Sequence, residues 1–292
     1  MEVTGDAARV RTVTERWRRE DVRVGFVPTM GALHAGHMSL VLRSLAECGR
    51  TAVSIFVNPT QFGPSEDLER YPRTVERDAE MLEKAGVDLL FAPTRETIYP
   101  EGFGTYVEPH PDLAGCLCGA RRPGHFRGVC TICAKLFNIV RPHVAYFGQK
   151  DFQQFRVVER MARDLDLPLK IALVPTVRED DGLAMSSRNA YLSPRERGQA
   201  VCLRRALDAA IEAVEGGERS VASLEAIMRD TISRYHPARL DYAEIRDART
   251  LQPLKILDKP AVFAISVYLG DARLIDNALI VPGRGEVHGD DV

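Results

Sequence analysis

The 292-residue chain lacks the features that define several protein classes. No apolar run reaches the roughly 18 residues that a membrane-spanning helix needs, and residues 1–17 contain no apolar segment typical of a signal peptide. The 41 acidic and 39 basic residues nearly cancel, leaving a formal charge of −2, so there is no excess of basic residues typical of nucleic-acid-binding domains. We therefore expect a cytoplasmic protein that has neither a membrane nor a nucleic acid as its partner.

Cysteine is also scarce, with six residues in the chain. In a protein without a signal peptide we expect these to be reduced thiols rather than a disulfide framework. Cys116, Cys118, Cys130 and Cys133 form a C-x-C and a C-x-x-C pattern, which is one way to bind zinc. The second pair lies in the apolar run GVCTICAKLFNIV, where cysteine acts as a small core residue, so we favour core packing over zinc.

The apolar content, 45% of residues, is sufficient for one large or two ordinary folded domains, which excludes disorder of the whole chain. Apolar runs predict strands at 22–27, 51–57, 87–92, 144–147 and 169–174. The first two do not alternate polar with apolar residues, which is typical of strands buried on both faces of a parallel sheet. Between the strands we expect helices at 37–48, 66–85, 126–140 and 151–164. This alternation predicts an open sheet of Rossmann type, whose ligands bind beyond the carboxyl ends of the strands.

The composition changes after residue 175. Residues 176–193 are polar and rich in turn formers, and two helical stretches follow within 194–235. Three strand-like runs near 240–246, 261–269 and 272–280 favour an antiparallel sheet, and we expect a loose tail after about 282. The sequence thus predicts an α/β protein. A Rossmann-like, parallel-sheet nucleotide-binding domain at 1–176 is followed by a smaller α+β domain with an antiparallel sheet at 177–292.

The loop after the first predicted strand carries the strongest chemical signal. Walker A, H-E-x-x-H and G-x-S-x-G patterns are missing, and no G-x-G-x-x-G follows a strand. Instead the loop reads PTMGALHAGH, in which His34 and His37 flank Gly36 at a helix start. A single histidine there would be interpreted as a cap or a core residue. The pair, beside small residues and a helix N-terminus, favours binding of phosphate.

This H-x-G-H is similar to the nucleotide-binding signature of class I aminoacyl-tRNA synthetases and related nucleotidyltransferases. A second phosphate-binding candidate is the segment Met185, Ser186, Ser187 and Arg188, whose hydroxyl and guanidinium groups suit phosphate oxygens. From about residue 24 to 280 the chain resembles the pantothenate synthetase (pantoate–β-alanine ligase) family. The resemblance rests on PTMGALHAGH, SIFVNPTQFGPSEDLERYPRT, RPGHFRGV, AYFGQKDFQQ and VPTVREDDGLAMSSRN.

The resemblance implies a two-step reaction, in which ATP and (R)-pantoate give pantoyl adenylate and pyrophosphate, and the amine of β-alanine then displaces AMP. It also implies Mg²⁺ with ATP as substrate, no organic prosthetic group and a homodimer. The catalytic residues it implies are His37, the residue usually described as a proton donor, with His34, Lys150 and Arg188. It assigns pantoate to Gln61 and Gln154, and β-alanine to Gln61.

The ATP-binding residues implied by the resemblance form three segments: Met30, Gly31, Ala32, Leu33, His34, Ala35, Gly36 and His37; Gly148, Gln149, Lys150 and Asp151; and Val177, Met185, Ser186, Ser187 and Arg188. Asp78 is a candidate metal ligand, with a solvated helix residue as the alternative. Because 177–193 is so polar, we expect it to be mobile without ATP and the 177–292 domain to act as a lid.

Two other functions remain open at this stage. The chain could be another H-x-G-H nucleotidyltransferase acting on a small acid or phosphate, or a nucleotide-binding protein without activity. The departures from the family pattern are the four cysteines of the C-x-C and C-x-x-C pattern and His143. They lie away from the signature loops, so the expected activity does not depend on them.

Overall fold

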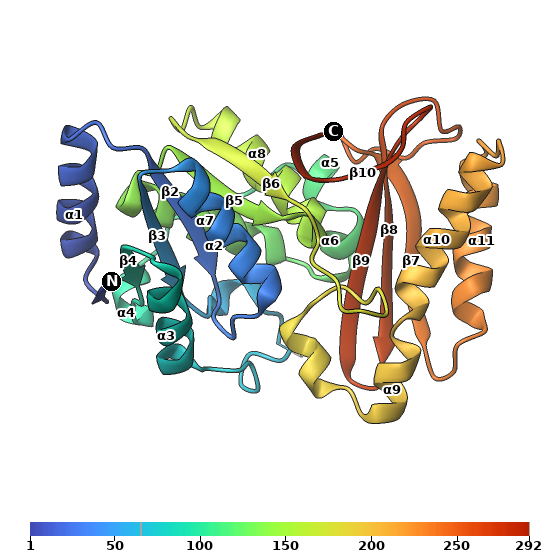
Figure 1. Cartoon of the computed structure of the whole chain (residues 1–292), viewed down its shortest axis with the longest axis horizontal. Helices are drawn as coiled ribbons and strands as arrows, with labels where there is room; N and C mark the ends of the chain where they lie inside the picture. Colours follow the sequence, from blue (N-terminus) through green and yellow to red (C-terminus); the bar gives the residue numbers. More distant parts are fainter. Residues whose placement is uncertain (65, 292) are drawn as a thin grey trace. The chain divides into compact units, whose positions relative to one another are not determined.

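The computed structural model of the chain describes residues 1–64 and 66–291 (Figure 1). The chain divides into two compact units. The first comprises Met1–Gly148 and Gln154–Val174, and the second Gln149–Gln153 and Pro175–Val292. The short piece Gln149–Gln153 belongs with the second unit although it directly follows a strand of the first, an arrangement that local sequence patterns do not reveal.

The first unit is built on a six-stranded sheet in which every neighbouring pair is parallel. Its strands are β1 (Glu2–Thr4), β2 (Val24–Thr29), β3 (Arg50–Ile55), β4 (Leu89–Phe91), β5 (Val144–Gly148) and β6 (Lys170–Val174), in the order β1-β4-β3-β2-β5-β6. The expected Rossmann-type sheet is therefore confirmed. The chain proceeds from β2 to β3 on one side and from β5 to β6 on the other, so the topological switch point lies between β2 and β5.

Helices cover both faces of this sheet, which explains why its strands read as continuous apolar runs. The α-helices of the unit are α1 (Ala7–Arg19), α2 (Ala35–Glu47), α3 (Val75–Ala85), α4 (Arg95–Ile98), α5 (Pro111–Ala114), α6 (Leu117–Arg121), α7 (His125–Val140) and α8 (Phe152–Asp164), whose first two residues belong to the second unit. On β2, Val27 shares a buried cluster with Val41 of α2. The preceding residue, Phe26, meets Phe137 of α7 edge to face at 6.4 Å. Neighbouring strand residues thus enter opposite layers of core.

Two local expectations for the first unit are wrong or incomplete. Strand β1 and helix α1 were not expected. Helix α3 begins at Val75, not at 66, because Pro72 disfavours helical backbone at the residue before it and Thr74 occupies the N-cap position. The helix ends where expected, at Gly86, whose φ of +92° is left-handed.

The second unit packs two helices on an antiparallel sheet, as expected. Its strands are β7 (Arg239–Asp247), β8 (Ala261–Leu269), β9 (Ala272–Val281) and β10 (Gly285–Val287), in the order β10-β9-β8-β7. Its α-helices are α9 (Pro194–Gln199), α10 (Cys202–Glu215) and α11 (Val221–Ser233). In Figure 1, α10 and α11 lie side by side along this sheet. Leu207 and Leu224 of these helices share a buried cluster with Phe263 and Ile265 of β8.

The expected loose tail after 282 is wrong, because Gly285–Val287 pairs with β9 as β10. Gly283 and Gly285 adopt positive φ values of +81° and +78°, and Arg284 N–H donates to the carbonyl of Val281 at 2.9 Å, which closes the turn. In the part of the chain that the structure describes, no helix is both long and apolar enough to span a bilayer.

Candidate active site

The loop between β2 and α2 is held by a buried carboxylate. Gly31 and Ala32 both have left-handed backbone, with φ of +82° and +52°. Successive residues of this kind turn their N–H groups toward one point. Here the N–H groups of Ala32 and Leu33 donate to Asp78 at 2.8 and 3.0 Å. A Cβ on Gly31 would lie 3.0 Å from Ile55, so both the backbone angle and the space favour glycine.

Asp78 itself lies on α3 and has no exposed surface. Its Oδ2 atom also accepts a hydrogen bond from the hydroxyl of Thr74 at 3.2 Å. The interpretation of Asp78 as a solvated helix residue is therefore wrong. Its role as a metal ligand stays a prediction, while the geometry shows a carboxylate whose two oxygens hold the loop in place.

His34 and His37 form the entrance of α2. His34 is the N-cap residue, and its Nδ1 accepts from Gly36 N–H at 3.1 Å. The Nδ1 of His37 accepts from His34 N–H at 3.3 Å, and the two ring centroids are 4.1 Å apart. A ring nitrogen that accepts from a backbone N–H carries no proton of its own, so each neutral imidazole has its hydrogen at Nε2.

This tautomer makes both rings hydrogen-bond donors through Nε2. Both Nε2–H groups are donors, and they stand beside the N-terminus of a 13-residue helix, where the helix dipole favours anions. Donors that are fixed before the reaction can stabilise charge that develops on phosphoryl oxygens. The arrangement therefore suits the binding of a nucleotide phosphate. A core or capping function alone would not require two such donors.

Gln61 lies on the short helix η1 (Pro59–Gln61) and is held at both ends of its amide. Its Oε1 accepts from Asn58 Nδ2 at 3.0 Å, and its Nε2 lies 3.0 Å from the sulfur of Met30. Asn58 Nδ2 also donates to the carbonyl of Gly128 on α7 at 3.1 Å. A Cβ on Gly128 would lie 2.3 Å from the carbonyl oxygen of Thr60, so the close contact between α7 and η1 requires glycine at this position.

A second network fixes the backbone of Gln61, and its members were not among the residues expected to have a role. Nδ1 of His125 lies 2.9 Å from the Gln61 carbonyl oxygen and donates to it, since Nε2 of the same ring faces the guanidinium of Arg122 at 3.0 Å. Arg122 in turn forms a two-bond pair with Glu66, at 2.8 and 2.6 Å. Burial raises the pKa of Glu66, but its bonds to Arg122 outweigh that effect and leave the pKa below its usual value. The motif RPGHFRGV, which contains Arg122 and His125, is the sequence feature from which these two residues could have been predicted.

Gln154, the other residue expected to bind pantoate, lies in the first turn of α8 and is half-buried. It belongs to the same unit as Gln61 and the two histidines. Gly148 ends β5, whereas Gln149, Lys150 and Asp151 form the short helix η2 (Gln149–Asp151) of the second unit. The residues expected to bind ATP therefore fall in both units.

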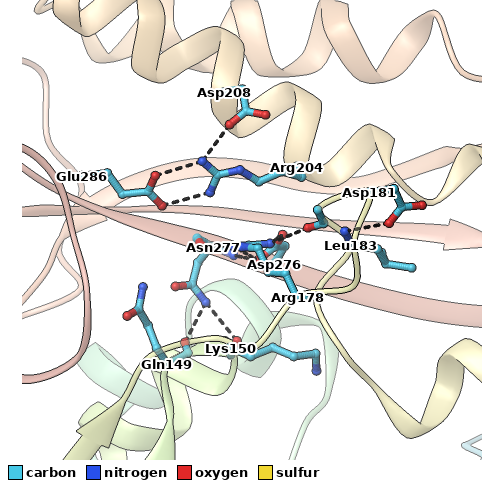
Figure 2. Close-up of polar contacts among 12 residues, drawn as sticks. Gln149, Lys150, Arg178, Asp181, Leu183, Arg204, Asp208, Asp276, Asn277 and Glu286 are labelled. Atoms are coloured by element: carbon cyan, nitrogen blue, oxygen red, sulfur yellow. Dashed lines mark hydrogen bonds and ion pairs between the residues drawn. The ribbon is translucent and has the colours of Figure 1, made fainter. Parts of the chain in front are cut away.

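In the second unit, η2 is tied to strand β9. The amide Nδ2 of Asn277 donates to the carbonyls of Gln149 and Lys150, at 2.8 and 2.9 Å (Figure 2). The side-chain oxygen of Gln149 accepts from Gly289 N–H at 2.9 Å, and Gln149 is 1% exposed. These contacts fix the backbone of Lys150, the residue expected to neutralise phosphate charge.

The segment after Val177 folds as a tight hairpin. Arg178 pairs with Ala184, Met185 N–H donates to Val177 at 3.0 Å, and Gly182 turns the chain at a φ of +92°. Arg178, one of the charged residues of this segment, forms two bonds through its guanidinium with the buried Asp276. The mobility expected for 177–193 without ATP stays a prediction.

The expected phosphate-binding segment follows this hairpin. Ser186 is the N-cap of η3 (Ser187–Tyr191), and its hydroxyl accepts from Arg188 N–H at 3.3 Å. Arg197 of α9 also holds the hairpin by donating to Glu179 at 2.8 Å and to Asp181 at 2.7 Å. The segment is therefore attached to a braced hairpin.

The cysteines form no metal site in the described ranges, 1–64 and 66–291, where no group of three or more His, Cys, Asp or Glu residues could hold a metal ion. All six are free thiols. Cys130 and Cys133 lie inside α7. Burial raises the pKa of Cys130 to about 12 and that of Cys133 still further. These thiols are therefore core residues that stay protonated at neutral pH.

An open parallel sheet, whose loop after β2 offers small residues, two imidazole donors and a helix N-terminus, defines a nucleotide-binding α/β protein. Comparison with known proteins gives the family. A family model described as pantoate-beta-alanine ligase matches residues 2–279. The pantothenate synthetase of Thermotoga petrophila is 51% identical over 280 residues, which cover 96% of this chain and 100% of the relative. That of Heliobacterium modesticaldum is 54% identical over 268 residues, covering 90% and 95%.

Solved structures agree. The crystal structure of pantothenate synthetase from Thermus thermophilus has a TM-score of 0.90 and 47% identity, and covers 95% of this chain and 98% of its own. Pantoate-beta-alanine ligase from Francisella tularensis, complexed with beta-gamma ATP and beta-alanine, has a TM-score of 0.77 and 33% identity, with coverage of 96% and 97%. The chain therefore belongs to the pantoate–β-alanine ligase family and is a ligase, which confirms the resemblance seen in its motifs.

Proposed function

We propose that this chain condenses (R)-pantoate with β-alanine to give pantothenate, AMP and pyrophosphate. The observation that carries the proposal is the pair of fixed Nε2–H donors of His34 and His37 at the N-terminus of α2, in a chain of this family. In the first step, a carboxylate oxygen of pantoate attacks the α-phosphorus of ATP, and the bond to pyrophosphate breaks. In the second, the amine of β-alanine attacks the acyl carbon, loses a proton and displaces AMP.

The chain's contribution to the first step is charge stabilisation and positioning. His37 and His34 donate to phosphoryl oxygens as negative charge develops on them. Lys150 and Arg188 neutralise the departing pyrophosphate, and the residues of the loop from Met30 to His37 contact the nucleotide. The rigid attachment of that loop to Asp78 supports this role, because donors that need no rearrangement are the effective ones.

Pantoate is proposed to bind Gln61 and Gln154, whose amides can both donate to a carboxylate and accept from hydroxyls. Gln61 is also the proposed contact of β-alanine. The anchoring of Gln61 through its side chain and its carbonyl supports this assignment, since an amide that is already oriented loses little entropy on binding.

Mg²⁺ is proposed to enter with ATP as part of the substrate. Two observations support this over a resident metal site: Asp78 already accepts three hydrogen bonds from backbone and hydroxyl donors, and the described residues contain no group of three or more His, Cys, Asp or Glu that could hold a metal ion. A Mg²⁺ ion that keeps its contacts to phosphates and water needs no protein cage. We also propose a cytoplasmic homodimer, in line with the family.

The second unit is proposed to act as a lid on the reaction, excluding water from the mixed anhydride. Hydrogen exchange across 177–193 should slow when ATP, Mg²⁺ and pantoate are added. Arg188→Ala should slow adenylation and allow the adenylate to be hydrolysed, so that AMP forms without β-alanine. Unchanged exchange would contradict the lid.

The proposed function is tested by leaving out each of the three substrates in turn. ATP with D-pantoate should release pyrophosphate in an amount close to that of the enzyme, and addition of β-alanine should start continuous release of AMP. Another H-x-G-H nucleotidyltransferase would release its nucleotide conjugate instead. Pyrophosphate release that does not depend on pantoate would overturn the assignment.

A further inference from the structure

The strand β9 carries two neighbouring polar residues, Asp276 and Asn277, between the apolar residues Ile275 and Ala278. They are only 2% and 3% exposed. Neighbouring strand residues point to opposite faces of a sheet. Leu274 and Ala278 belong to the core under α10 and α11, so Asp276 lies on that helix-covered face and Asn277 on the other. Buried polar groups are kept only when they are paired, so the partners of these two residues matter.

Asp276 is paired with Arg178 of the hairpin. Two parallel bonds of 2.6 and 3.0 Å join guanidinium and carboxylate, and Arg178 Nη1 also donates to the carbonyl of Gly182 at 3.0 Å. Arg178 thereby connects strand β9 both to its own position in the hairpin and to Gly182 at the turn. A bidentate pair fixes orientation as well as distance.

The same hairpin is tied to the segment that carries Arg188. The amide of Asn189, the next residue, donates to the carbonyl of Ala184 at 3.2 Å and to the carboxylate of Glu179 at 2.8 Å. The backbone position of Arg188 is therefore set by a chain of contacts that begins at Asp276.

Asn277 holds the second segment, the short helix η2 that contains Lys150. Each hydrogen of its Nδ2 serves one carbonyl, that of Gln149 or that of Lys150. Its amide oxygen is buried and has no hydrogen-bond partner among the residues that the structure describes. The contribution of this side chain therefore lies in its donor group, which fixes the backbone of Lys150 (Figure 2).

We propose that Asp276 and Asn277 are positioning residues for adenylation, which set the spacing between Lys150 and the Arg188 segment from two adjacent positions of one strand. The proposal rests on the proposed function, in which these two cations neutralise the departing pyrophosphate. A displacement of about 1 Å in such a group can cost about 10² in rate. Transfer of the acyl group to β-alanine breaks a different bond and does not release pyrophosphate, so it depends less on this spacing.

The two half-reactions test the proposal with the full-length chain. The variants are Asp276→Asn, which keeps the shape but loses the charge, and Asn277→Ala, which removes the donor. Pyrophosphate release in a single turnover with ATP, Mg²⁺ and D-pantoate should fall about 10-fold to 100-fold. AMP release from supplied pantoyl adenylate and β-alanine should change less than about 3-fold, as should the KM for pantoate.

A matched control is the pair Arg273–Asp241, which joins β9 to β7 through bonds of 3.0 and 2.7 Å. Asp241→Asn removes a charge from a similarly buried pair of the same sheet, and it should leave both half-reactions near wild type. Should Asp276→Asn fail to fold, Arg178→Lys keeps a counter-charge while losing the two-bond geometry, and the same selective loss is expected.

Equal slowing of both half-reactions, or wild-type adenylation in a folded Asp276→Asn or Arg178→Lys variant, would show a merely structural pair and overturn the proposal. Failure of the proposed function is distinguishable, because the wild-type chain itself would then release no pyrophosphate with pantoate.

Discussion

Replacement of Asp78 by asparagine tests whether this carboxylate anchors the nucleotide loop or binds a metal ion. The two side chains have the same shape. In the wild type, Oδ2 accepts from Ala32 N–H at 2.8 Å and Oδ1 from Leu33 N–H at 3.0 Å. The amide of asparagine must turn its NH₂ group toward one of these donors, so one buried N–H loses its acceptor whichever way the amide is oriented.

The expected loss of stability follows from this single unpaired N–H group. Loss of one hydrogen bond to a charged acceptor costs about 1.5–3 kcal/mol, and the free energy of unfolding should fall by that amount. The loop also holds left-handed backbone at Ala32, a conformation that persists only where its surroundings enforce it. Relaxation of the loop displaces His34 and His37, which follow it directly, and we expect adenylation to slow about 10-fold to 100-fold with a higher KM for ATP.

Two measurements separate the interpretations. Urea unfolding followed by circular dichroism gives the stability, and pyrophosphate release titrated with Mg²⁺ at saturating ATP gives the metal requirement. An anchor predicts lower stability and an unchanged Mg²⁺ requirement, whereas a metal ligand predicts the reverse. Thr74→Val is the matched control, since it removes only the 3.2 Å hydroxyl bond to Asp78 and should cost about 0.5–1.5 kcal/mol. Wild-type stability in Asp78→Asn would refute the anchor.

Three further predictions concern the histidines and the glutamines. His37→Ala should lower single-turnover pyrophosphate release about 10² to 10³-fold and leave the chain folded, and wild-type turnover from the folded variant would exclude the proposed donor. Gln61→Ala and Gln154→Ala should each raise the KM for pantoate about 10-fold to 100-fold and that for ATP much less; equal effects on both substrates would mean that the glutamines contact something else. Burial, with Arg18 and Arg23 nearby, lowers the pKa of His143 below its usual value of 6.5, so the unfolded state binds the proton first. The free energy of unfolding should therefore fall as the pH drops below about 6.5, and this part of the fall should be missing in His143→Asn, whose oxygen can replace the Nδ1 acceptor of Val24 N–H; parallel pH profiles of the two proteins would contradict it.

Local patterns in the sequence determined most of the secondary structure and the family. Continuous apolar runs mark strands β2, β3, β5 and β6 because a strand covered on both faces has no polar side. The left-handed Gly86 ends α3, as a residue without Cβ can. The loop PTMGALHAGH predicts phosphate binding from local sequence alone, since histidines next to glycine at a helix start suit phosphate.

The tertiary structure alone decided what holds these groups in place. Asp78 lies 46 residues from Ala32, His125 lies 64 from Gln61, and Asn277 lies 128 from Gln149. Periodicity and propensity act over a few residues, so they cannot show which distant donor meets which buried acceptor. The polar segment 177–193 is a further example. A charged run is polar by composition, and only the fold brings Asp276 to Arg178 and converts exposed charge into a buried pair.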